Sequence, residues 1–169
     1  DAVLENLHGQ LDPKRHLLVS VVTGVTIGQL LSKLKEPVPV VRAMPNTAIA
    51  IQESMTCLAA RDVNKAEINF VEDLFKQLGR IVWIDEKLMD AVTAVSGSGP
   101  AYVFAFIEAM QSAGEKLGLD APTARKLAYA TLEGATQLAH NSDEHAGILR
   151  ERVTSKGGTT AAALEVMKQ

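Results

Sequence analysis

The sequence predicts an α/β sheet domain over residues 1–85, followed by an all-helical domain over residues 86–169. Two observations support this division. Short apolar, β-branched runs alternate with helical periodicity as far as Asp85, as they do in layered α/β sheets. After Asp85 the strand pattern disappears, and only helical periodicity follows.

Four apolar runs are expected to form the sheet. The first, LLVSVV, is almost wholly apolar, which is typical of a strand buried on both faces of a parallel sheet. Asp62 or Asn64 is placed to cap the helix after the third run, and Gly79 is expected to end that helix as a left-handed residue. The predicted strands are residues 17–22, 38–42, 54–60 and 80–85, with a short helix at residues 25–34.

The second domain is predicted to contain helices alone. The segment SGSGP, residues 96–100, interrupts the first of them, and Ser142 is placed to cap a shorter one. The expected helices are residues 88–95, 101–117, 122–141, 142–152 and a final segment beyond Gly158.

These helices are rich in alanine and glycine, so that neighbouring helices can approach closely. Tyr102, Phe106, Met110 and Tyr129 are expected to be core residues rather than cofactor contacts. This helical domain of about 85 residues has more apolar surface than its own core can bury. The excess favours packing against a second copy of the chain.

Composition excludes several classes of function. A net charge of -3, with dispersed Lys and Arg, argues against a nucleic-acid partner. The four histidines show no metal-ligand spacing, so no metal site is expected. The single cysteine, Cys57, reads as a buried small residue in a reducing cytosol. No apolar run is long enough to span a membrane, and we expect a cytoplasmic protein.

The segment SKGGTT, residues 155–160, is the strongest candidate for a ligand site. Gly157 and Gly158 can bring backbone N–H groups close to a ligand, and Thr159 or Thr160 stands where an N-cap hydroxyl belongs. The first turn of the following helix favours a carboxylate or phosphate. Alternatively, the glycines join two helices and Thr159 caps the second.

The glycines of SGSGP invite comparison with a dinucleotide-binding fingerprint. The third glycine is missing, and the preceding element is helical rather than a strand, so the fingerprint interpretation fails. Either the segment is a flexible break close to a bound ligand, or it is a kink between two helices.

Several motifs together resemble one known family. VSVVTGVTIGQL, VVRAMPNTAIAI, AVSGSGPAYVFAFIEAM and VTSKGGTTAAALEVM occur in the order and spacing of pyrroline-5-carboxylate reductases. The resemblance implies an incomplete Rossmann-type sheet domain, followed by a dimerisation domain like that of 6-phosphogluconate dehydrogenase. It further implies reduction of 1-pyrroline-5-carboxylate to L-proline, the last step of proline biosynthesis, with NADPH or NADH.

Against that family the sequence departs at both ends. The leading βαβ unit and the end of the last helix are missing, so we expect the 169-residue chain alone to bind NADPH poorly and not to turn over. Lys156 also stands where many relatives have proline, which leaves the loop looser and adds positive charge.

The resemblance assigns the substrate residues. Ser155, Gly157, Gly158 and Thr159 would hold the substrate carboxylate, and Thr160 would hydrogen-bond the ring nitrogen as the catalytic residue. Glu144 matches a family acid that contacts the nitrogen region from the other subunit. Its alternative role is that of a first-turn helix acid stabilised by the helix dipole.

Cofactor contacts are expected at the ends of the first two strands. Val22 and Thr23 follow one strand, and Met44, Pro45 and Asn46 follow the next, at the carboxyl edge where α/β sheets place ligands. The alternative is a proline-marked turn in which Asn46 is a local cap.

Two other functions stay open. One is a 3-hydroxyacid dehydrogenase of the 6-phosphogluconate dehydrogenase type, although Lys116 and Lys126 flank a turn instead of occupying an apolar helix as an acid/base lysine would. The other is a catalytically impaired oligomerisation fragment. We expect a homodimer or a higher homo-oligomer in each case.

Overall fold

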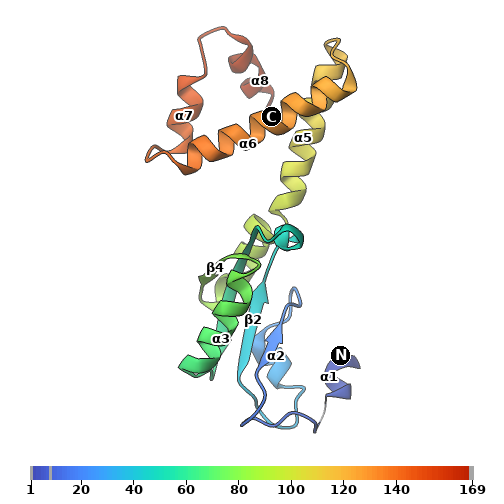
Figure 1. Cartoon of the computed structure of the whole chain (residues 1–169), viewed down its shortest axis with the longest axis vertical. Coiled ribbons are helices and arrows are strands. Elements are labelled where there is room, and N and C mark those ends of the chain that lie inside the picture. The colour runs from blue at the N-terminus through green and yellow to red at the C-terminus, as the bar shows by residue number, and fades with distance from the viewer. Residues whose placement is uncertain (1, 8, 168–169) are drawn as a thin grey trace. The chain divides into compact units, whose positions relative to one another are not determined.

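The computed structural model describes residues 2–7 and 9–167. The chain forms two compact units, Asp1–Phe104 and Ala105–Gln169. Strands occur in the first unit and helices make up the second, as Figure 1 shows. The predicted order of an α/β sheet followed by helices is confirmed.

A four-stranded mixed sheet is the centre of the first unit. Its strands are β1 (Leu18–Ser20), β2 (Val40–Met44), β3 (Ser54–Arg61) and β4 (Gly79–Trp83), hydrogen-bonded in that order. β1 and β2 are parallel and so are β3 and β4, but β2 and β3 are antiparallel.

The parallel pairing expected of the first strand is confirmed, but the sheet as a whole is mixed, because β3 runs antiparallel to β2. A parallel pair needs a crossover of a dozen or more residues. Only a short loop with the 3-10 helix η1 (Thr47–Ile51) joins β2 to β3, so β3 must return antiparallel.

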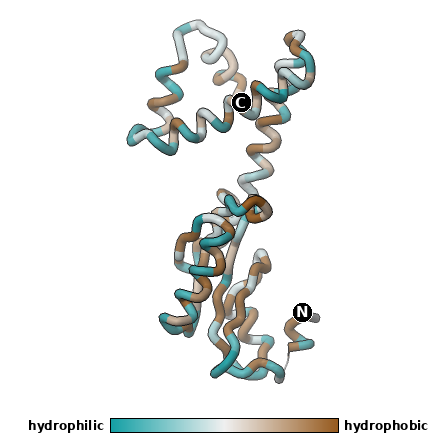
Figure 2. Tube along the Cα trace, in the orientation of Figure 1, coloured by the Kyte–Doolittle hydropathy of each residue, from teal (hydrophilic) through white to brown (hydrophobic). Residues whose placement is uncertain are grey.

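Each face of the sheet is covered by helices. Helix α3 (Lys65–Lys76) packs Val71 and Phe75 against Val41, Ala43 and Leu58. The alternate residues of β2 face the other way, where Val40 packs with helix α2 (Ile27–Leu31) and Met44 packs with Met89. The hydrophobic stretches of Figure 2 follow these strands. Met44, the last residue of β2, is therefore held in place by packing against Met89 and Ala59.

Local signals set the ends of these elements. Asn64 caps α3, with its Oδ1 accepting from the N–H groups of Ala66 and Glu67 at 2.9 and 3.0 Å. Thr26 caps α2, which is shorter than predicted. Gly79 opens β4 with φ +135° instead of ending α3, and any Cβ there would overlap the Ser54 carbonyl. The predicted left-handed helix end at Gly79 is therefore wrong.

Cys57 is buried in β3, as predicted, with 4% of its surface exposed. It is the register partner of Met44 across the antiparallel pair. Burial raises the pKa of the Cys57 thiol.

The segment after β4 winds into the long helix almost without a break. It comprises η2 (Glu86–Leu88), α4 (Met89–Val92) and a π-helical turn η3 (Thr93–Gly97), followed by α5 (Gly99–Lys116). The Ser98 N–H donates to the Thr93 carbonyl at 2.8 Å. The predicted interruption at SGSGP is thus a wide turn and a bend at Ser98.

The second unit holds α6 (Ala121–His140), α7 (Ala146–Arg152), α8 (Thr159–Met167) and most of α5. Asp120 caps α6. The predicted cap of α7 is wrong: His145 caps it, with Nδ1 accepting from the Gly147 N–H at 3.1 Å. Ser142 instead accepts from the Glu144 N–H and closes a turn.

The helical half buries little apolar surface within one copy. In the described part of the second unit, Ala124 and Ala128 are the buried hydrophobic residues. Phe106 and Tyr129 are 41% and 48% exposed, and Tyr102, on the part of α5 in the first unit, is 60% exposed. Their prediction as core residues is wrong for a single chain, because their side chains are exposed to solvent.

No helix in the described part of the chain is both long enough and apolar enough to cross a membrane. The first helix, α1 (Ala2–Asn6), is only five residues long.

Candidate functional site

The carboxyl ends of β1 and β2 lie side by side and bring two predicted cofactor contacts together. Because the two strands are parallel, Thr23 after β1 and Met44 at the end of β2 share one edge of the sheet. The Thr23 hydroxyl lies 3.8 Å from the Met44 sulfur. Val22 is 55% exposed beside them, whereas Met44 is 9% exposed. The edge therefore presents an apolar surface with a hydroxyl at its rim.

Pro45 and Asn46 continue this edge into η1. The Asn46 Oδ1 accepts from the Ala48 N–H at 3.1 Å, so Asn46 is a local cap, as the alternative interpretation had it. Its own N–H donates to Ser54 Oγ at 3.1 Å. The side-chain amide nitrogen faces Ser96 Oγ at 3.5 Å. Both ends of the amide are thus held, and a capping role does not exclude a ligand-binding one.

Sequence reasoning missed that the π-helical turn lies against this edge. A Cβ built on Gly97 would lie 2.7 Å from the Met44 methyl carbon. Ser96 contacts both Asn46 and the Met55 carbonyl, each at 3.5 Å. The signal was present in the glycines of SGSGP, but a sequence does not reveal which strand a turn will contact.

A hollow of about 620 Å³ adjoins Asn46 within the first unit. Its lining is mostly apolar and includes Ile51, Val95, Val103 and Phe104, with Ser96 as a polar neighbour. Sequence reasoning gave no sign of it, because η1 and the start of α5 are about 50 residues apart.

The segment predicted to bind the substrate carboxylate, residues 155–160, forms a tight turn before α8. The Gly158 N–H donates to the Ser155 carbonyl at 3.1 Å, and Gly157 has φ +74°. A Cβ on Gly158 would overlap the Ser155 hydroxyl and lie 3.3 Å from its carbonyl oxygen. Both glycines are therefore required by the turn.

Gly158 occupies the N-cap position of α8. The helix begins at Thr159, and the Gly158 carbonyl accepts from the Ala162 N–H at 3.2 Å. The expectation that a threonine hydroxyl stands at the N-cap is thus wrong, because the helix starts one residue earlier. The N–H groups of Thr159, Thr160 and Ala161 precede that first helical bond and have no intrahelical acceptor. Thr160 is half-buried and Thr159 is exposed.

Glu144 forms a two-point ion pair with Arg152, which ends α7. The Arg152 Nη2 donates to Glu144 Oε1 at 2.6 Å, and Nη1 lies 2.6 Å from Oε2. Glu144 precedes the cap of α7, so it is not the first-turn helix acid of the alternative interpretation. Sequence spacing did not identify Arg152 as its partner.

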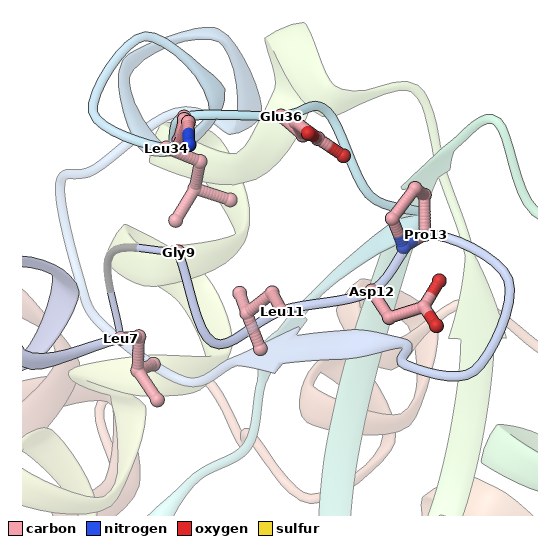
Figure 3. A pocket seen from close by; sticks show the side chains of 8 residues that line it. Leu7, Gly9, Leu11, Asp12, Pro13, Leu34 and Glu36 are labelled. Carbon is pink, nitrogen blue, oxygen red and sulfur yellow. The ribbon is translucent and has the colours of Figure 1, made fainter.

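A further hollow lies in the first unit, near its first helix. A hollow of about 240 Å³ lies between the segment after α1 and the loop after α2. Leu11 and Leu34 extend toward each other across it, with Asp12 and Glu36 at its border (Figure 3). Within residues 2–7 and 9–167, no group of three or more His, Cys, Asp or Glu is arranged to hold a metal ion.

Comparison with known proteins gives consistent similarities. The family model described as pyrroline-5-carboxylate reductase dimerisation matches residues 86–169. The chain is 43% identical to the pyrroline-5-carboxylate reductase of Pseudomonas aeruginosa over 166 residues, covering 97% of this chain and 60% of the relative. It is 39% identical to the Synechocystis enzyme over 170 residues, covering 100% of this chain and 62% of the relative.

Solved structures agree. The Plasmodium falciparum pyrroline carboxylate reductase with NADP bound has a TM-score of 0.93 and 34% identity, covering 99% of this chain and 67% of its own. The Streptococcus pyogenes enzyme has a TM-score of 0.91 and 30% identity, covering 99% and 63%. The chain spans about three fifths of the length of the curated relatives it matches.

Proposed function

The chain belongs to the pyrroline-5-carboxylate reductase family, and from this premise we propose that its residues take part in the reduction of 1-pyrroline-5-carboxylate to L-proline with NADPH or NADH. Membership confirms the predicted fold class, a Rossmann-type sheet domain followed by a helical dimerisation domain. The observation that carries the proposed activity is the turn at residues 155–158 before α8, in a family whose substrate bears a carboxylate.

The turn supports a role as the carboxylate anchor. Ser155, Gly157, Gly158 and Thr159 would surround the acid with backbone N–H and hydroxyl donors. A helix N-terminus favours an anion because its amides are unpaired and its dipole is positive there. Neutral donors fix the orientation of the carboxylate without adding a charge to the site.

Thr160 is proposed to hydrogen-bond the ring nitrogen of the imine and of the product amine. Its position one residue beyond Thr159, and its half-buried side chain, support a role different from that of the exposed Thr159. Because solvent can protonate the imine, the protein needs no strong acid. The residues then contribute orientation and exclusion of water.

Glu144 is proposed to lie near the same nitrogen, contributed by the other subunit of a dimer. A carboxylate there favours the protonated iminium form, whose carbon is more electrophilic. The Arg152 fork fixes the carboxylate plane, and we assign Arg152 the role of a positioning residue.

The nicotinamide end of the cofactor is proposed to bind at the edge formed by the ends of β1 and β2. The residues that would hold it are Val22, Thr23, Met44, Pro45 and Asn46. The edge suits a flat ring with an amide: it is apolar at Val22 and Met44 and polar at Thr23 and Asn46. When bound, NADPH or NADH supplies the hydride that reduces the C=N bond. The protein's part is to orient the two reactants and exclude water.

A homodimer or larger homo-oligomer is proposed to assemble through residues 86–169, with residues 1–85 as the cofactor domain. The exposed apolar side chains of α5 and α6 support this, since single copies of stable domains rarely leave so many large side chains uncovered.

The test is proline formation from 1-pyrroline-5-carboxylate with NADPH or NADH. The chain is compared with a fusion that supplies the leading βαβ unit of the Pseudomonas aeruginosa relative. We expect turnover in the fusion, and the chain alone shows how much of that turnover its own residues sustain. An oligomer by light scattering that neither turns over nor changes NADPH fluorescence, in both forms, would instead support a catalytically impaired oligomerisation module.

A further inference from the structure

We propose that Gly97 is a positioning residue: its lack of a side chain sets where the Met44 thioether lies at the end of β2. The inference rests on the proposed function, because Met44 there contacts the nicotinamide end of the cofactor. It concerns the SGSGP segment, to which the proposed reaction assigns no other role.

Contacts on two sides define the position of Met44. Its sulfur lies 3.8 Å from the Thr23 hydroxyl. A Cβ added to Gly97 would lie 2.7 Å from the Met44 methyl carbon, well inside ordinary contact distance. The thioether thus fills the space between the end of β1 and the π-helical turn.

The turn is the fixed part of this contact. Met89, at the start of α4, is 1% exposed and packs with Met44 and Ala59. The Thr93 hydroxyl donates to the Met89 carbonyl at 2.8 Å, and the Ser98 N–H closes the wide turn on the Thr93 carbonyl at 2.8 Å. π-helical turns of this kind are frequent at functional sites.

Met44 is the part that can move. Its methyl is the far end of a flexible side chain, whereas Gly97 is held within a hydrogen-bonded turn. A side chain at Gly97 would therefore displace the thioether rather than open the sheet. Such a shift of the Met44 side chain changes the protein surface that contacts the nicotinamide ring, and hence the orientation of the cofactor.

The experiment compares Gly97→Ala with Gly99→Ala in whichever form, chain or fusion, is active. Gly99 is a matched control two residues away, because a Cβ there meets no atom within 4 Å. The chain has five methionines, so ¹³C-methyl labelling gives a resolvable spectrum, in which Met44→Leu identifies the Met44 signal. Steady-state kinetics, NADP⁺ titration of that signal and melting temperature are measured for each variant.

We expect Gly97→Ala to shift the Met44 methyl signal and to lower kcat about tenfold, since small misplacements of reactants have effects of this size. The KM for the imino acid and the melting temperature should stay close to those of the parent. Gly99→Ala should behave as the parent does. An unchanged kcat in Gly97→Ala, with or without a loss of melting temperature, would overturn the proposed role of Gly97 and leave the proposed cofactor site standing. A parent in which NADP⁺ leaves the Met44 signal unmoved would overturn the cofactor site itself, and the inference with it.

Discussion

The Glu144 carboxylate and the Arg152 guanidinium form a parallel two-point pair, with both nitrogen–oxygen distances at 2.6 Å. The pair joins the loop after α6 to the last residue of α7, just ahead of the turn at residues 155–158. Forked pairs of this kind fix the plane of a carboxylate as well as its position.

Replacing Arg152 by Ala should lower kcat/KM for the imino acid about tenfold, because Glu144 loses its orientation. Arg152→Lys should restore only part of the loss, since an ammonium cannot form the fork. Arg150→Ala is the control: Arg150 lies two residues away, and its guanidinium makes a long, exposed contact of 4.0 Å with Glu151. Equal losses in both alanine variants would count against the positioning role.

Thr160→Ala should depress turnover far more than Thr159→Ala. Losing one hydrogen-bond donor to the reacting group costs about tenfold to a thousandfold in rate. Thr160→Ser keeps the hydroxyl and should retain most of the activity. The comparison is made by kcat at saturating imino acid, and parity between the two alanine variants would refute the assignment.

Gly158→Ala should raise the KM for the imino acid by about tenfold, equivalent to about 1.4 kcal/mol of binding. The new methyl group would overlap the Ser155 hydroxyl, so adding Ser155→Ala should relieve part of the strain. The residual effect combines the nearby Ser155 carbonyl at 3.3 Å with the loss of the Ser155 hydroxyl as a carboxylate donor. Gly134→Ala, where a Cβ meets no atom within 4 Å, serves as the control.

Asp120 should make the stability of α6 sensitive to acid. Hydrogen bonds from the backbone N–H of Thr123, and then from its hydroxyl, lower the pKa of the Asp120 carboxyl. A lowered native pKa contributes stability that is complete above the ordinary aspartate pKa of about 3.9 and is lost as the pH falls through the native value.

The melting temperature of the parent should therefore exceed that of Asp120→Ala at pH 7, and the difference should shrink as the pH falls below about 4. Asp120→Asn keeps a capping side chain without the charge, so its advantage over alanine should not depend on pH. A parent-to-alanine difference that persists unchanged into acid would contradict the assignment.

Local chemistry made much of the fold predictable. All four strands form within the predicted runs or one or two residues beyond them, and Asn64 caps α3 as expected. Strand direction was not predictable, since β3 has the same apolar pattern whether it runs parallel or antiparallel. The short link through η1 decided it.

The candidate site divides in the same way. The glycines at residues 157 and 158 could be identified because their conformation is a local property. The contact between Gly97 and Met44 depends on how distant segments pack, which no local pattern encodes. The pair of Glu144 and Arg152 depends on how the loop before α7 folds against that helix. Ser142 resembles a helix cap in sequence, but its hydroxyl closes the preceding turn instead.

The pairing of Cys57 with Met44 gives the protein a native chemical probe. The chain has one cysteine, and its thiol is buried, with its pKa raised, on the strand opposite the end of β2. A thiol reagent can therefore modify the chain only when the sheet opens at that place. Its rate of modification reports local opening around Cys57, which lies between Met44 on β2 and Val82 on β4, without any label being introduced.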